Sequence, residues 1–289
     1  MISPFQYKIP LTLQEACDLL WESGGKAKVI AGGTDLVIGL RKGDLKPPLL
    51  IDITRLPELH GIEEKNGLIT IGAGVTHAEL SSSALLKKNG KILSEAASEI
   101  GSPQIRNLGT IGGNIVNASP AADTVPALMV LDAAGEVISR EGKRKVPLAD
   151  LFKGPYETAL KPCEILTRIS FERLSADTRC SFVRLARREA MAIARMSVAL
   201  ALRIGREEDR IEDIRISVGA VTPTPHRIAD AEVFLKGRSP DRDLFKEASR
   251  KVSESILGRS GMRASSSYKV PVVEALFIRA LEEALREGV

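Results

Sequence analysis

The chain has 289 residues, 44% of them hydrophobic and 27% charged, and a formal net charge of +4. This length and composition are those of an ordinary globular protein of about two domains. The weak positive charge, together with an aromatic content of only 4%, argues against nucleic acid as a partner.

The cysteines and the amino terminus bear on where the protein works. Cys17, Cys163 and Cys180 form no C-x-x-C pair, which argues against an iron–sulfur or zinc site in this chain. A sparse, odd set also fits a reducing cytoplasm better than a disulfide framework. The segment 1–20 does not combine a basic stretch with an apolar core. No run reaches the ~20 apolar residues of a membrane span, so we expect neither a signal peptide nor a span.

The first part of the chain, residues 1–56, is typical of a small β-α-β unit. Thr12 and Glu15 form a capping box in T-L-Q-E, which predicts the start of an amphipathic helix. The pattern then predicts a strand at 28–31, a turn at Gly32-Gly33, a helix from Thr34 to Leu40 and a strand at 49–53.

Residues 57–176 predict an antiparallel sheet with helices on one side. Strands are expected at 67–74, at 135–140 and 143–152 as a hairpin-like pair divided by Glu141-Gly142, and at 163–172. Helices are expected at 77–88, at about 88–100, and from Asp123 or Thr124 to about Met129.

After a boundary near residue 176 the pattern changes again. Strands are predicted at 182–188, 196–205 and 211–227, and amphipathic helices near 241–257 and 270–287. The run RLARREAMAIAR at 184–195 is the nearest thing to a basic patch, and its plain interpretation is the solvated face of a helix.

The Gly32-Gly33 pair follows a predicted strand and precedes a predicted helix. Such a pair either lets the chain turn tightly or lets backbone amides approach a ligand, and amides at a helix start favour an anion. The G-x-G-x-x-G and G-K-[ST] patterns are absent, so a Rossmann fingerprint and a P-loop are both excluded.

A second glycine pair, Gly112-Gly113, lies in the small and polar stretch NLGTIGGNIVNASPAAD at 107–123. Consecutive amides in such a stretch can form a nest for an anion. Asp123 would repel phosphate but would accept hydrogen bonds from sugar hydroxyls; the alternative is a simple helix N-cap. Two amide-rich loops and one carboxylate suggest a cofactor with a diphosphate and a polyol, and FAD has both.

These segments also resemble a known family, the FAD-binding medium subunit of molybdenum hydroxylases of the xanthine dehydrogenase and carbon monoxide dehydrogenase class. The resemblance rests on AGGTDL at 31–36 and on GSPQIRNLGTIGGN at 101–114, which is close to the bacterial forms. It covers essentially the whole chain, because LLIDITRLPEL, GLITIGAGVTHAEL, CEILTRISF, VGAVTPTPHR and GRSGMRASSSYK follow in the family's order.

The resemblance implies an α+β fold. Two N-terminal α/β subdomains, 1–56 and 57–176, would form an FAD-binding fold like that of the vanillyl-alcohol oxidases, and 177–289 would form a C-terminal α+β domain with a small antiparallel sheet and helices. FAD would be held without a covalent bond. A histidyl link at His60 or His77, as in some oxidases of similar fold, is the less favoured alternative to a plain surface or cap histidine.

The family's cofactor-binding positions carry over to particular residues of this chain. The diphosphate would be cradled by the backbone amides of two segments, Val29, Ile30, Ala31, Gly32, Gly33, Thr34 and Asp35, and Thr110, Ile111, Gly112, Gly113 and Asn114. Asp123 would contact the ribityl region, Leu166 would pack near the isoalloxazine, and Ile100 and Ile193 are weaker candidates near the ring. Arg184 stands where many members carry lysine near the flavin.

Two departures from the family pattern bear on this site. Arg184 keeps the charge of lysine, but its guanidinium is bulkier and does not titrate in the physiological range, which puts acceptor behaviour in doubt. Ala192 replaces a residue that is often aspartate, so an acidic contact there is in doubt as well. The cysteine-bearing insert of the benzoyl-CoA reductase branch is absent, and no further iron–sulfur cluster is expected.

The resemblance implies an electron-transfer subunit rather than a hydroxylase by itself. A large partner would carry molybdopterin and a small partner [2Fe-2S] clusters, in a dimer of heterotrimers in the cytoplasm. Electrons would reach FAD in this chain and leave to an acceptor such as NAD+, without a general base here. The alternatives are a self-sufficient flavin oxidase or reductase and a non-catalytic nucleotide-binding assembly module.

Overall fold

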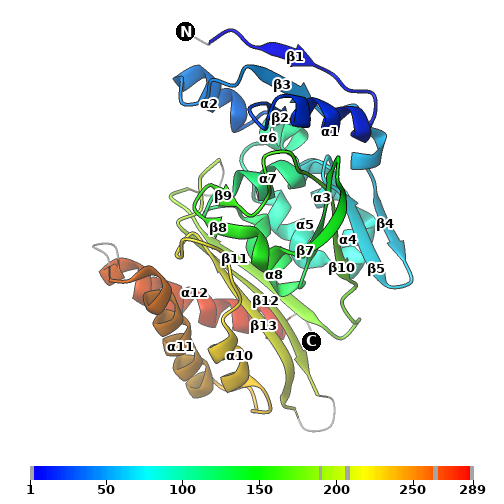
Figure 1. The fold of residues 1–289 in the computed structure, drawn as a ribbon. Helices are drawn as coiled ribbons and strands as arrows, with labels where there is room; N and C mark the ends of the chain where they lie inside the picture. Colours follow the sequence, from blue (N-terminus) through cyan, green and yellow to red (C-terminus); the bar gives the residue numbers. More distant parts are fainter. Residues whose placement is uncertain (1–2, 189–190, 206–208, 263–265, 287–289) are drawn as a thin grey trace.

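The computed structural model describes residues 3–188, 191–205, 209–262 and 266–286 and has the predicted α+β class. Figure 1 shows an N-terminal unit at one end, a central unit, and a C-terminal unit of strands and helices at the other end. Each unit has its own sheet, while the predicted cuts at 56 and 176 stay predictions. Within the described residues, no helix has both the length and the apolar character for crossing a membrane.

The N-terminal unit is a parallel sheet in the order β1-β3-β2 with two helices. Thr12 Oγ1 accepts from the Glu15 amide, which is one half of the predicted box, whereas the Glu15 side chain accepts from the Leu11 amide. The second helix begins two residues later than predicted, because Gly33, at φ +70°, extends the turn. The elements are β1 (Gln6–Lys8), α1 (Leu13–Glu22), β2 (Lys28–Ile30), α2 (Leu36–Lys42) and β3 (Leu49–Asp52).

The central unit contains the predicted antiparallel sheet, in the order β4-β5-β10-β6-β7. Its strands are β4 (Ile62–Lys65), β5 (Leu68–Gly72), β6 (Ala134–Ser139), β7 (Gly142–Pro147) and β10 (Ile165–Glu172), with the small ladder β8 (Phe152–Gly154) and β9 (Glu157–Thr158) beside it. Its helices are η1 (Pro57–Leu59), α3 (His77–Ser82), α4 (Ala84–Asn89), α5 (Lys91–Ser98), α6 (Pro103–Leu108), α7 (Ile111–Asn117), α8 (Thr124–Val130) and α9 (Leu148–Leu151).

Of the helix predictions for the central unit, one is wrong and one is confirmed with shorter bounds. The segment 77–88 is divided at Ser83, whose side chain accepts from the Leu86 amide and caps α4. The helix expected at about 88–100 is α5 and begins only after Gly90, which has φ −157°. A Cβ on Gly90 would lie 3.1 Å from the Phe171 ring, so the close approach of β10 accompanies this break.

The C-terminal unit is an antiparallel sheet in the order β11-β12-β13 with three helices. On β12, Val198 and Leu200 pack into the core shared with the C-terminal helices, whereas Ala199 and Ala201 pack into the core of the central unit. The sheet is therefore buried on both faces. The elements are β11 (Arg179–Leu185), β12 (Met196–Ile204), β13 (Ile211–Gly219), α10 (Ala229–Leu235), α11 (Arg242–Ser260) and α12 (Ser266–Arg286).

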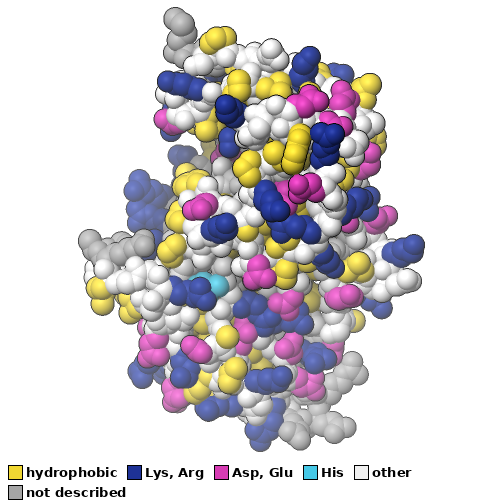
Figure 2. Space-filling model, in the orientation of Figure 1, with side chains coloured by type: hydrophobic (Ala, Val, Ile, Leu, Met, Phe, Trp, Pro, Cys, Tyr) yellow, Lys and Arg dark blue, Asp and Glu magenta, His cyan; other side chains and the backbone are white. Residues whose placement is uncertain are grey.

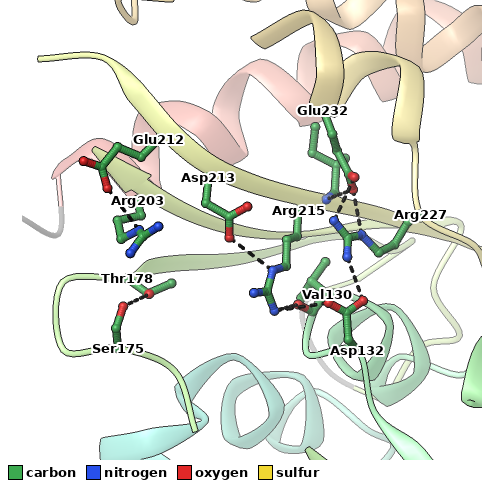
Figure 3. Close-up of polar contacts among 11 residues, drawn as sticks. Val130, Asp132, Ser175, Thr178, Arg203, Glu212, Asp213, Arg215, Arg227 and Glu232 are labelled. Carbon is green, nitrogen blue, oxygen red and sulfur yellow. Dashed lines mark hydrogen bonds and ion pairs between the residues drawn. The ribbon is translucent and has the colours of Figure 1, made fainter. Parts of the chain in front are cut away.

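A network of ion pairs joins the central unit to the C-terminal sheet (Figure 3). Asp132, just after α8, accepts from Arg227 Nη1 at 2.6 Å and pairs with Arg215 Nη1 at 3.3 Å. Arg227 also donates from Nε and Nη2 to the two carboxylate oxygens of Glu232 in α10. Elsewhere on the face drawn in Figure 2, lysine and arginine alternate with aspartate and glutamate.

We expect Asp132→Asn to lower the free energy of unfolding by about 1 kcal/mol, because it removes the charge that both arginines share. The effect is small because the Asp132 side chain is 54% exposed. Asparagine tolerates the left-handed backbone found here, φ +49°, so backbone strain does not add to it. Urea denaturation would measure the change, and a stability equal to wild type would show that the network contributes nothing measurable.

Candidate cofactor site

The two glycine segments of the sequence meet in the structure. A Cβ built on Gly32 would lie 1.8 Å from the Leu108 carbonyl oxygen and 3.0 Å from the Gly109 Cα. Only a residue without a side chain allows the backbones to approach this closely. Thr34 Oγ1 in turn lies 3.5 Å from the position of a Cβ on Gly109. The N-terminal unit therefore contacts the central unit through a joint of bare backbone, formed by Gly32–Thr34 and Leu108–Gly109.

The backbone of the first glycine segment has unused donors. The amides of Gly32, Gly33, Thr34 and Asp35 donate to no described residue. Asp35 is the N-cap of α2 but makes no capping bond through its side chain. Because backbone amides rarely stay unpaired except toward water or a ligand, this row is a candidate site for an anion. Val29, Ile30 and Ala31 lead into it from β2.

The second glycine segment begins a helix instead of forming an open loop. The amides of Ile111 and Gly112 donate to the Val75 and Ala73 carbonyls, and the Gly113 and Asn114 amides donate to Thr110. Gly112 packs closely on Ala73, 2.7 Å from a built Cβ. The Thr110 amide and hydroxyl hydrogen have no acceptor among the described residues. Among the backbone amides and hydroxyls of this segment, Thr110 therefore keeps donors that a ligand could use.

Asp123 is a buried carboxylate with one unused oxygen. The residue is 6% exposed, and Oδ2 accepts from Arg184 Nη1 at 3.2 Å. Oδ1 is buried without any partner, so the N-cap interpretation fails, since the side chain makes no capping bond. Burial, partly offset by Arg184, raises the pKa of Asp123 to about 6. An unpaired buried oxygen of this kind indicates a missing hydrogen-bond donor.

Asn114 links α7 to the start of α8, next to Asp123. Its Oδ1 accepts from the Thr124 hydroxyl at 2.6 Å, which ties the first turn of α8, next to Asp123, to α7. The Asn114 side chain is thus used within the fold, and its predicted contact with a cofactor stays a prediction.

The remaining residues predicted to lie near the isoalloxazine ring differ in burial. Leu166 lies buried in β10, where a Cβ on Gly135 would be 2.7 Å from its Cδ1. The Ile100 carbonyl accepts from Arg106 Nη1, and the Ile193 side chain is 81% exposed. Their contact with a cofactor stays a prediction. The expected helix over 184–195 is wrong for the described residues, because Arg184 and Leu185 pair with Ser197 and Met196 in the β11–β12 ladder.

His77 was expected to be a plain surface or cap histidine, and it is the first residue of α3, directly after the N-cap Thr76. It is nevertheless buried, with 2% exposed, and its Nδ1 has no partner among the described residues. Its Cδ2 lies 3.1 Å from the position of a Cβ on Gly109, so the ring lies against the joint of the two glycine segments. T-H-A-E at 76–79 forms a complete capping box; that signature was present in the sequence. His60, by contrast, is exposed as expected.

Burial, reinforced by the charge of Arg106, lowers the pKa of His77 to about 4. We therefore expect no protonation of His77 between pH 5 and 8, which nuclear magnetic resonance of the imidazole would measure. Because the folded-state pKa is below the ordinary 6.5, stability is lost as the pH falls from 6.5 to 4, by about 3 kcal/mol. His77→Gln should remove that loss; an imidazole that titrates near 6.5 would contradict the buried placement.

Comparison with known proteins places this chain in a family. Residues 3–171 match the family model described as the FAD binding domain in molybdopterin dehydrogenase, and residues 181–284 match that of the CO dehydrogenase flavoprotein C-terminal domain. The chain is 35% identical over 279 residues to the glyceraldehyde dehydrogenase medium chain of Sulfolobus acidocaldarius, with 96% of this chain and 98% of that protein covered.

Further relatives agree in sequence and structure. The carbon monoxide dehydrogenase medium chain of Hydrogenophaga pseudoflava is 32% identical, with 98% of both chains covered. A solved structure of carbon monoxide dehydrogenase from the same organism superposes with a TM-score of 0.92 at 31% identity, covering 99% of both chains. This chain therefore belongs to the family of FAD-binding medium subunits of the molybdenum hydroxylases, oxidoreductase subunits that include the xanthine dehydrogenase and carbon monoxide dehydrogenase medium chains.

Proposed function

We propose that this chain holds FAD between the Gly32–Asp35 amides and Asp123, and that it passes electrons from [2Fe-2S] clusters on a small partner subunit to NAD+ or another acceptor. The observation that carries the proposal is that the chain has both a row of free amides and a buried carboxylate oxygen that lacks a donor. Amides suit a diphosphate, and a lone carboxylate oxygen suits a hydroxyl.

The residues of the chain fit FAD in a specific way. The Gly32–Asp35 amides and the Thr110 hydroxyl would donate to the diphosphate, and Asp123 Oδ1 would accept from the ribityl hydroxyls. Ile111–Asn114 already use their amides within the fold, so their direct contribution would require shared hydrogen bonds. Leu166, Ile100, Ile193 and Arg184 are proposed to lie toward the ring.

FAD supplies the redox chemistry when it is bound, because a flavin accepts and releases electrons. The chain's own residues bind it, orient it and surround it with a partly apolar wall. The proposed electron transfer requires no side chain of the site to act as a general base. The buried neutral His77 and the apolar core behind Leu166 keep water from the inner side of the site.

The assembly of this chain with partner subunits is proposed from its membership of the family. The family's medium chains work with an iron–sulfur small subunit and a molybdenum large subunit, and we propose a dimer of such heterotrimers in the cytoplasm for this chain. The substrate pocket would then belong to the large partner, whose identity decides the substrate of the complex.

Purification under native conditions tests the proposal. The isolated chain should be yellow and release FAD into the supernatant on acid precipitation. From the native complex two further chains should co-purify, one with iron and labile sulfide and one with molybdopterin. Flavin retained on the precipitate would favour a covalent oxidase at His60 or His77. A colourless protein that takes up no added FAD would contradict the proposal and favour an assembly module.

A further inference from the structure

Arg184 joins three segments that border the proposed FAD site. It projects from β11, and its side chain is 5% exposed. Nη1 donates to the Glu99 carbonyl at 2.9 Å, to Asp123 Oδ2 at 3.2 Å and to the Ala192 carbonyl at 3.2 Å. Nη2 pairs with Glu99 Oε2, also at 3.2 Å. The segments after α5, before α8 and between β11 and β12 therefore meet at one guanidinium.

This guanidinium is already engaged by the protein, chiefly through Nη1. Nη1 carries two hydrogens, and three acceptors already share them. Nη2 forms an ion pair with the Glu99 carboxylate. A side chain that is buried and used in this way is suited to fixing its neighbours and poorly suited to contacting a cofactor itself.

The segment that Arg184 holds through Ala192 presents apolar side chains outward. Met191 is 58% exposed, with a left-handed backbone at φ +53°, and Ile193 is more exposed still. Arg188 holds the same segment at the surface, where its Nη2 donates to the Met191 carbonyl at 2.6 Å. Arg184 is thus the inner anchor of residues 191–193, and Arg188 is the outer one.

We propose that Arg184 is a positioning residue of the flavin site that acts through Asp123 and Ala192 and does not itself contact the cofactor. By binding Asp123 Oδ2, Arg184 leaves Oδ1 as the free oxygen. By binding the Ala192 carbonyl, it fixes the position of the neighbouring Ile193. This inference rests on the proposed function, and it differs from the role in cofactor binding that the family position implies for Arg184.

Substitution of Arg184 by lysine distinguishes a positioning role from a direct contact with the flavin. A lysine ammonium is a compact donor without the planar fork of arginine, so Arg184→Lys keeps a positive charge but cannot span Glu99, Asp123 and Ala192 together. If Arg184 only supplied charge to the flavin, lysine would replace it without loss, as in the relatives that carry lysine there.

The test compares Arg184→Lys with Arg188→Lys, the matched control that touches the same segment but not Asp123. Hydrogen exchange of the 191–195 amides is measured on the flavin-free full chain, and FAD affinity and the visible flavin spectrum are measured on the loaded chain. We expect Arg184→Lys to speed exchange at 192–195 at least tenfold, to raise the Kd for FAD about tenfold and to alter the spectrum. Arg188→Lys should leave affinity and spectrum unchanged.

Three results would overturn the inference. If affinity falls in Arg184→Lys while exchange stays at wild-type rates, Arg184 contacts FAD directly. If exchange rises while affinity and spectrum stay unchanged, its role is purely structural, and if nothing changes it has neither role. Failure of wild type itself to bind FAD would instead reject the proposed function, and the exchange data on the flavin-free chain would still report the anchoring.

Discussion

Replacing Gly32 by alanine is expected to abolish FAD retention and to lower the free energy of unfolding by about 3 kcal/mol, the upper end of typical overpacking costs. The added methyl group would lie 1.8 Å from the Leu108 carbonyl oxygen and 2.5 Å from its carbon. Both are backbone atoms at the end of α6, so no rotamer change relieves the clash. The joint must open, and the amides of Gly32–Asp35 then move away from Thr110 and Asp123.

Gly258→Ala is the matched control for this substitution. Gly258 lies inside α11, and a Cβ there meets nothing within 4 Å. Because glycine weakens a helix interior, this change should stabilise the protein by about 0.5–1 kcal/mol. Urea denaturation and flavin absorbance of the purified chains would measure both variants. A Gly32→Ala protein that keeps stoichiometric FAD and wild-type stability would show that the two glycine segments do not meet as described.

Most strands of the central and C-terminal sheets could be predicted because their patterns are strong. The strand β4 was not predicted, and the strand expected at 143–152 ends at Pro147, where α9 begins. On β12, MSVALALRI alternates large and small apolar residues, and the structure explains why both sets are buried: Val198 and Leu200 face one core and Ala199 and Ala201 the other. The strand β1 was not predicted, because Gln6, Tyr7 and Lys8 are all exposed and carry no alternation. Its place comes from pairing with β3, a contact between segments about forty residues apart that no local pattern encodes.

The sequence indicates candidate residues for a cofactor site but not how these residues are arranged. The sequence indicated Gly32, Gly112 and Asp123, yet it gave both glycine pairs the same role. In the structure Gly32 allows contact between two backbones, whereas Gly112 packs a helix on Ala73. The burial of His77 and of Arg184 depends on elements far apart in the chain, so neither followed from residue type or spacing.

The second large effect is expected at Asp123, where function and stability oppose each other. We expect Asp123→Asn to raise the free energy of unfolding of the flavin-free chain at pH 7 by about 3 kcal/mol. The folded-state pKa of about 6 lies above the ordinary 3.8, with burial as the largest cause. The folded state therefore binds more protons between these values, and stability falls as the pH rises through them. Arg184 keeps the Glu99 carboxylate as a partner in the variant, so no buried charge is left unpaired.

The same substitution should weaken FAD binding about 10- to 100-fold, because hydrogen bonds to a charged acceptor contribute about 1.5–3 kcal/mol. Asp52→Asn is the control of opposite sign. Although burial acts to raise it, hydrogen bonds from Thr54 and Tyr7 lower the pKa of Asp52, so removing that carboxylate should cost stability near neutral pH.

Urea titrations of wild type and Asp123→Asn from pH 3.5 to 7.5, without flavin, isolate the contribution of Asp123. The other carboxylates and His77 cancel in the difference between the two proteins. That difference should be close to zero below pH 4, grow until about pH 6 and then stay constant. A variant that is less stable than wild type at pH 7 would mean that the ion pair with Arg184 outweighs the desolvation of Asp123. The unpaired oxygen would then no longer indicate a carboxylate kept in the core for a ligand at a cost in stability.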